Sequence, residues 1–165
     1  MPVAVSPSMR RRTRRSTLRQ PSKMNRAVAK FDALLEALEF VSFGQPMEHE
    51  AYLCMETGAI HYHSEYGDNE EPLPNDIEDS EKYIAIPYKN DLNLGRHLVL
   101  QFTDEFLPDE HGKVQEIFRR SGAYARFKDL LEHRGLVQRW HEYEAKAQRE
   151  ALRAWCRDNG IETDG

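Results

Sequence analysis

The spacing of apolar residues changes near residue 90 of this 165-residue chain, and the change limits what the chain can fold into. Between Ala51 and Pro87 the apolar runs are short and are separated by turn residues, which is typical of β-strands. From Asn90 onwards apolar residues recur every three or four positions, which is typical of helices that bury one face. The sequence therefore predicts a small sheet followed by a helical C-terminal half.

The first half of the chain is predicted to hold one helix and three strands. Apolar residues at helical spacing predict the helix over 25–41. The segments 51–55 and 59–63 flank Glu56-Thr57-Gly58, which predicts a hairpin. A third strand is predicted over 82–87, where the proline ends it, so that the three strands form an antiparallel meander.

Glycines divide the helical half. Gly122 and Gly135 separate helical patterns from one another, and the last pattern, which carries Trp140 and Trp155, is the longest. Gly160 is followed by an isoleucine, which is a common way for a helix to end. The fold class predicted is α+β, with an N-terminal helix, a small three-stranded antiparallel sheet and a helical C-terminal half.

Charge is distributed unevenly, although the net charge is only -5. Residues 1–31 contain nine Lys or Arg and no acid, whereas the remainder carries 14 bases against 28 acids.

Residues 1–23 are rich in Arg, Ser and Pro and are expected to be a disordered basic tail. Three explanations stay open for it: an over-extended gene start before Met24, a basic arm that contacts nucleic acid or acidic protein, and a targeting peptide. Residues 24–165 are expected to form a single α+β domain.

Cysteine usage and hydropathy bear on the compartment. Cys54 and Cys156 lie far apart in the sequence and lack the spacing of a paired metal or redox motif, which fits unpaired thiols in a reducing compartment. No apolar run approaches the roughly 18 to 20 residues that a membrane span needs. We expect a cytoplasmic protein that does not insert into a membrane.

Several runs of the sequence resemble one bacterial family. These runs are 51–58, 83–87, 91–96, 122–129 and 155–161, together with Trp140. In order, over residues 31–161, the chain is similar to the uncharacterised protein family UPF0158, and its C-terminal run is the most specific part. The resemblance implies a bacterial cytosolic protein. It implies no catalytic or binding residue, because the family has no established activity.

Histidines in the predicted hairpin raise the question of a metal. His61 and His63 are two positions apart on a predicted strand and share a face, and His49 and Glu65 are close in sequence. A zinc site needs three or four converging ligands, and the spacing here contains no CxxC pair or HExxH helix. We expect a partly exposed hairpin face, with no metal or other cofactor.

The region around the hairpin is acidic. Residues 44–81 contain eleven Asp or Glu and no Lys or Arg. The acids lack the periodic spacing of a calcium loop. The expected result is a solvated negative face, and two alternatives stay open for it: contact with a basic partner protein and an intramolecular contact.

Basic residues gather in the helical half, where the segment 119–139 has six bases and two acids. The candidate interaction patch comprises Arg119, Arg120, Tyr124, Arg126, Lys128, Arg134 and Arg139. Three roles stay open for these bases. They cover core aromatic residues, or they contact a partner protein, or they bind phosphates while Tyr124 stacks on a base.

The sequence contains no glycine-rich phosphate loop, Gly-x-Ser-x-Gly elbow or paired zinc motif, so it identifies no catalytic residue and no small-molecule ligand. It favours a non-enzymatic interaction or regulatory module with an acidic face and a basic C-terminal patch, which binds a partner protein or associates with itself. Two alternatives stay open. One is a nucleic-acid-associated regulator that binds short or single-stranded RNA or DNA, and the other is a metal-dependent hydrolase with its metal near His61 and His63.

Overall fold

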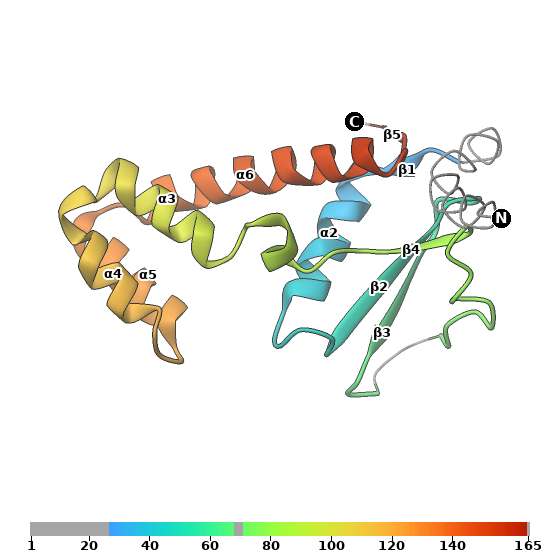
Figure 1. Cartoon of the computed structure of the whole chain (residues 1–165), viewed down its shortest axis with the longest axis horizontal. Coiled ribbons are helices and arrows are strands. Elements are labelled where there is room, and N and C mark those ends of the chain that lie inside the picture. Colours follow the sequence, from blue (N-terminus) through green and yellow to red (C-terminus); the bar gives the residue numbers. More distant parts are fainter. Residues whose placement is uncertain (1–26, 68–70, 165) are drawn as a thin grey trace, which may run out of the picture. The chain divides into compact units, whose positions relative to one another are not determined.

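A computed structural model describes residues 27–67 and 71–164, so the predicted tail over 1–23 lies outside the described residues. The chain divides into two compact units, with residues up to Ile86 and from Cys156 in the first and Pro87–Trp155 in the second. Figure 1 shows a sheet and a helix in the first unit and a group of helices in the second. The predicted α+β class is confirmed. That residues 24–165 form a single domain stays a prediction.

The N-terminal helix is α2 (Phe31–Ser42), which begins later than predicted. Its buried residues recur at three and four positions, because one face packs against the sheet; they are Phe31, Leu34, Ala37, Leu38 and Val41. The predicted start at residue 25 is wrong, because Ala29–Lys30 form a short strand, β1, before the helix.

The predicted hairpin is confirmed as β2 (His49–Cys54) and β3 (Ile60–Ser64). The third strand, β4 (Tyr83–Ala85), is present, but the predicted meander is wrong. The strand order is β3-β2-β4, so β4 pairs with β2 instead of β3. β2 is the most buried of the three strands, which suits its central position. The long segment between β3 and β4 allows the chain to return to the edge of β2 opposite β3.

A second, two-stranded sheet joins distant parts of the chain. β1 runs parallel to β5 (Thr163–Asp164), with Ala29 opposite Thr163 and Lys30 opposite Asp164. The Phe31 N–H donates to the Asp164 Oδ1 at 3.4 Å, so the same pairing also serves the first residue of α2. Neither strand was predicted, because a strand of two residues is too short to show an alternation of apolar and polar residues.

The second unit is helical. After the 3-10 helix η2 (Lys89–Leu92) come α3 (Arg96–Phe106), the 3-10 helix η3 (Pro108–Glu110), α4 (His111–Ile117) and α5 (Ala123–Arg134). The last helix, α6 (Val137–Asp158), begins in this unit. α4 contacts both α3 and α5.

Aromatic rings form the core of this unit around Phe102 on α3. The ring centre of Phe102 lies 5.2 Å from the rings of both Trp140 and Tyr143, and 6.5 Å from that of Phe127. Trp140 also meets Phe127 edge to face at 5.2 Å. The tryptophan and phenylalanine at helical spacing in the C-terminal sequence are therefore core residues.

The predicted glycine boundaries are confirmed. Gly135 (φ 69°) follows α5, and the Leu136 N–H donates to the Leu131 carbonyl at 2.9 Å. Gly160 (φ 68°) follows α6, and the Ile161 N–H donates to the Cys156 carbonyl at 2.8 Å. Both helices thus end with a left-handed glycine and a bond back across the last turn.

Both cysteines, Cys54 and Cys156, are buried, and no disulfide joins them. Among the helices in the described ranges, none is long and apolar enough to cross a bilayer.

Candidate functional site

The predicted basic patch lies in the helical unit, but its members have different surroundings. Arg119 and Arg120 are exposed in the turn after α4, where both face one carboxylate. Arg119 Nη1 lies 3.7 Å and Arg120 Nη2 lies 4.0 Å from oxygens of Glu116. Exposed pairs of this kind contribute little to stability, and they partly neutralise the two arginines.

Tyr124 lies in the first turn of α5 and is 42% exposed. The Nζ of Lys89 lies 4.5 Å from its ring centre, and the ring of Phe118 meets it edge to face at 5.0 Å. Burial raises the pKa of the Tyr124 hydroxyl, and the charge of Glu144 raises it further. The ring therefore already has a cation over one face.

Three other predicted residues also differ in what they touch. Arg126 Nη2 donates to the Ser121 carbonyl at 2.5 Å, which folds this side chain back over the start of α5. The guanidinium of Arg139 lies 5.1 Å from the ring centre of Phe106. Lys128 is exposed on α5. Arg139 thus covers a half-buried aromatic ring that packs on the core residue Phe102, and covering aromatic residues is one of the roles left open by the sequence.

A groove between α4 and α5 brings some of the predicted residues together. It has a volume of about 600 Å³ and is lined by Lys113, Ile117, Arg126, Asp129, Leu130, His133 and Arg134. We call this the basic groove. Of the predicted patch, only Arg126 and Arg134 line it.

The lining of the basic groove follows from helix geometry. On α5 the lining residues are spaced three and four apart, from Arg126 to Arg134, so they form one stripe along the helix. On α4, Lys113 and Ile117 are four apart and share a face in the same way. Lys113 and His133 were not predicted as site residues from the sequence. The stripe on α5 could have indicated His133, but nothing in the sequence shows that α4 faces it.

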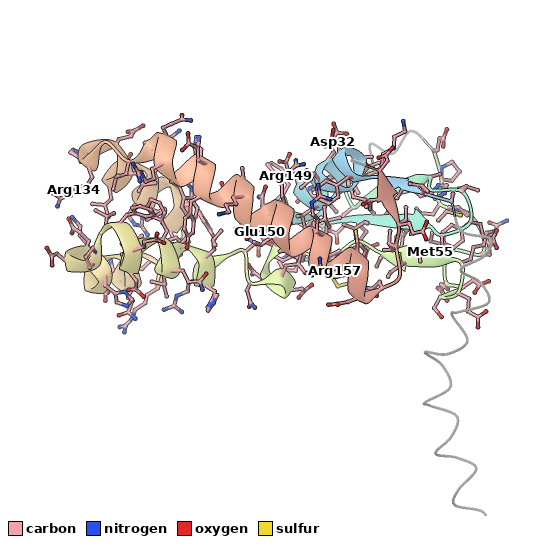
Figure 2. The ribbon with its side chains drawn as sticks, turned by 90° about the horizontal axis from the view of Figure 1, so that it is seen from above. Asp32, Met55, Arg134, Arg149, Glu150 and Arg157 are labelled. Carbon is pink, nitrogen blue, oxygen red and sulfur yellow. The ribbon has the colours of Figure 1, made fainter. Side chains whose placement is uncertain are left out.

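Charge in the groove is mostly positive. Lys113, Arg126 and Arg134 supply three cations against the single carboxylate of Asp129, while Ile117 and Leu130 supply apolar surface. Arg134 is also ion-paired with Glu110 of η3, whose side chain is largely buried. Figure 2 shows the side chain of Arg134 projecting from the helical unit. His133 Nδ1 lies 2.8 Å from the Asp129 carbonyl oxygen. The groove can therefore accept an anion while covering an apolar group.

The hairpin histidines do not gather with the other candidate ligands. His61 lies against Tyr83 of β4, with ring centres 5.8 Å apart, whereas His49 packs on Phe40 of α2 at 5.0 Å. Within residues 27–67 and 71–164, no three His, Cys, Asp or Glu side chains are grouped so as to hold a metal. These side chains therefore offer no metal centre in the part of the chain that is described.

Part of the acidic segment is paired internally. Lys82 Nζ lies 2.9 Å from the Asp76 Oδ2, and the Tyr83 hydroxyl donates to the Asp76 Oδ1 at 3.2 Å. The hydrogen bond from Lys82 holds the pKa of Asp76 below its ordinary value, and the same pair raises the pKa of Lys82. Asp76 is therefore less available to a partner than the unpaired acids.

Comparison with known proteins gives a family but no activity. The model of an uncharacterised protein family, UPF0158, matches residues 24–164. No curated protein and no solved structure matches the chain. The match covers both compact units, including the basic groove and the sheet. The chain therefore belongs to the uncharacterised protein family UPF0158.

Proposed function

We propose that the chain is a cytoplasmic, non-enzymatic interaction module whose basic groove binds an acidic segment of a partner protein or of a second copy. The observation that carries this proposal is the lining of the groove, where three cations surround two apolar side chains. A carboxylate-rich segment with apolar residues between its acids is complementary to that lining.

The dimensions and chemistry of the groove support a peptide segment. A volume of about 600 Å³ lies within the range of sites that enclose a few side chains. The guanidinium of Arg126 can bind a carboxylate through two parallel hydrogen bonds, and Lys113 supplies a second charge across the groove. Ile117 and Leu130 would then pack against an apolar side chain between the two acids.

The surroundings of the other basic residues favour a protein partner over a nucleic acid. Binding single strands commonly uses an open aromatic ring, but the ring of Tyr124 has Lys89 over it. Arg139 is placed on Phe106, and Arg119 is close to Glu116. Fewer cations are therefore free to follow a phosphate backbone than the sequence alone indicates.

The test compares two labelled probes bound to the full chain. One is a peptide of alternating Glu and Leu, and the other is a single-stranded RNA of equal net charge, with binding measured by fluorescence anisotropy. We expect the peptide to bind more tightly. Arg126→Gln should weaken it by about tenfold, which corresponds to about 1.4 kcal/mol.

Lys128→Gln is the matched control, because it removes the same charge from the same helix outside the groove. It should change peptide affinity by less than about twofold. Circular dichroism of both variants checks that each remains folded. An equal loss of peptide affinity in the two variants would mean that only the net charge of the protein matters, not the groove. Tighter binding of the RNA than of the peptide would favour the nucleic-acid alternative. Sedimentation at increasing protein concentration separates self-association from binding to another protein.

A further inference from the structure

The first unit carries a second surface, on which aromatic rings gather around His49. The ring centre of His49 lies 5.0 Å from Phe40, 5.6 Å from Phe43 and 5.8 Å from Tyr66. Phe40 also meets Tyr62 edge to face at 4.9 Å. Phe43 is 72% exposed and Tyr66 is 64% exposed, so large ring surfaces face solvent. Exposed rings clustered in this way are characteristic of binding surfaces.

Carboxylates lie beside these rings. Glu48 hydrogen-bonds the Tyr66 hydroxyl, and this bond, with the nearby charges of Glu48 and Glu65, raises the pKa of that tyrosine. Glu36 lies close enough to Tyr62 for its charge to raise the pKa of that hydroxyl, after the larger effect of burial. We call the surface formed by Phe40, Phe43, His49, Tyr62, Tyr66, Glu36, Glu48 and Glu65 the acidic aromatic patch. Residues 32–81 contain no Lys or Arg, so no cation of this segment neutralises it.

Within the described part of the chain, His49 also has no polar partner. It is only 9% exposed, and neither ring nitrogen has a hydrogen-bond partner among the described residues. A buried ring nitrogen without a partner is uncommon in folded proteins. A ligand with N–H donors, once inserted between Phe43 and Tyr66, could supply the missing hydrogen bond.

The chemistry of this patch selects arginine. A guanidinium stacks on aromatic rings, forms charge-assisted hydrogen bonds with carboxylates and has five N–H donors. Lysine can supply the charge, but it lacks the planar stacking surface. We propose that the acidic aromatic patch binds the arginine cluster of this same chain, Arg10, Arg11, Arg12, Arg14 and Arg15.

The length of chain between the cluster and the patch suits this contact. The Ala27 N–H donates to the carbonyl of Met55, which directly follows β2 and is labelled in Figure 2. His49 is at the opposite end of β2, and a six-residue strand is about 20 Å long. Arg15 lies twelve residues before Ala27. A linker of that length averages about 20 Å between its ends and reaches about 40 Å when extended.

A linker whose average length matches the span gives the highest effective concentration, in the millimolar range for short linkers. The arginines of the chain itself therefore have an advantage over basic segments of other proteins at ordinary cellular concentrations. For this reason we assign the patch to the chain's own cluster.

The experiment uses the full chain with a nitroxide spin label on Thr13→Cys, within the arginine cluster. Both native cysteines are buried, and wild-type protein treated with the same reagent controls for their labelling. We expect the amide NMR signals of Phe43, Tyr62 and Tyr66 to lose about half their height or more near 0.05 M salt, and to recover near 0.5 M salt, because screening weakens the contact. Broadening centred on the acidic residues 76–81, or no localised broadening, would overturn the proposal.

A mixed sample distinguishes the sources of the arginines. Spin-labelled chain without ¹⁵N is added to ¹⁵N-labelled chain without a spin label. Broadening of the patch in this mixture to the same extent would show that a second copy is the occupant and would overturn the proposal. Broadening of the patch in the sample whose chains carry both the spin label and ¹⁵N, together with its absence from the mixture, supports the proposal.

Matched substitutions separate ring stacking from charge. Glu65→Gln should reduce the broadening at Tyr66, whereas Glu81→Gln, which removes the same charge outside the patch, should not. Replacing the five arginines with lysine should leave a weaker effect than wild type, and replacing them with glutamine should abolish it. Equal broadening in the lysine and wild-type proteins would contradict a role for the rings. None of the labelled or substituted residues in these measurements lines the basic groove, so their result is independent of peptide binding there.

Discussion

The Nζ of Lys89 lies 4.5 Å from the ring centre of Tyr124. Such a cation–π contact at a partly exposed site contributes about 0.5–1 kcal/mol. We therefore expect Lys89→Met, which keeps much of the side-chain volume, to lower the free energy of unfolding by that amount. Urea denaturation followed by circular dichroism measures the change. Lys128→Met on α5 is the control, and an equal loss in both variants would show that the contact with the ring contributes nothing specific.

The pKa shift of Asp76 predicts a pH dependence of stability. Its pKa is held below the ordinary value near 3.8, chiefly by the hydrogen bond from Lys82. A carboxylate with a lowered pKa in the folded state contributes stability above its unfolded pKa, and the contribution is lost as the pH falls through the folded pKa. Wild type should therefore be more stable than Asp76→Asn at neutral pH, and the difference should shrink once the pH falls below about 4.

Urea midpoints of the two proteins, measured from neutral to strongly acidic pH, test this expectation. Asp79→Asn is a useful comparison, because Asp79 accepts a hydrogen bond from the Glu81 backbone but has no ion pair among the described residues. A wild-type advantage over Asp76→Asn that persisted unchanged at the lowest pH would mean that the charge of Asp76 is not its source.

Two glycines of the helical unit should respond to alanine in opposite directions. A side chain at either Gly112 or Gly135 would meet no atom within 4 Å, so packing does not decide the outcome. Gly112 is in α4, where alanine should raise the free energy of unfolding by about 0.4–1 kcal/mol. Gly135 has a φ of 69°, and alanine there should lower the free energy of unfolding by about 1–2 kcal/mol. Thermal and urea denaturation of both variants check the signs, and two changes of the same sign would contradict the assigned backbone conformations.

The ion pair between Glu110 and Arg134 should limit how tightly the basic groove binds an acidic peptide. Glu110→Gln leaves Arg134 free to pair with the peptide, so we expect affinity to rise by about two- to fivefold, which is less than 1 kcal/mol. The cost to the free energy of unfolding should be about 1 kcal/mol or less, because Arg134 is half exposed. Anisotropy with the alternating Glu and Leu peptide measures the first effect. Weaker binding by a fully folded Glu110→Gln protein would show that the pair instead holds Arg134 in its binding position.

Local patterns in the sequence predicted much of the fold. Buried residues of α2 follow the helical period that indicated it, and Gly135 and Gly160 are at helix ends as expected. The strand order required more than local information, because β4 pairs with β2 across the long segment that follows β3. The pairing of β1 with β5 joins positions more than 130 residues apart, and neither two-residue strand has a period to detect.

In the candidate site too, local sequence patterns identified some residues, and long-range packing determines the others. Arg126 and Arg134 were found because basic residues are conspicuous in an acidic chain, and both line the groove. Lys113 was missed because its place depends on how α4 packs against α5. The partners of the remaining bases could not be predicted either. Glu110 meets Arg134 from 24 positions away, and Lys89 reaches Tyr124 from a 3-10 helix well before α5.

The parallel pairing of β1 with β5 also determines how the chain can be re-engineered. Neighbouring strands are about 5 Å apart, so Ala29 and Thr163 are adjacent although they are near opposite ends of the described chain. Because β1 and β5 run parallel, the end of β5 and the start of β1 are separated by only about the length of one two-residue strand. A few Gly and Ser residues could therefore join Asp164 to Ala27, and new ends could be opened at the exposed turn around Thr57, giving a circular permutant of the same fold.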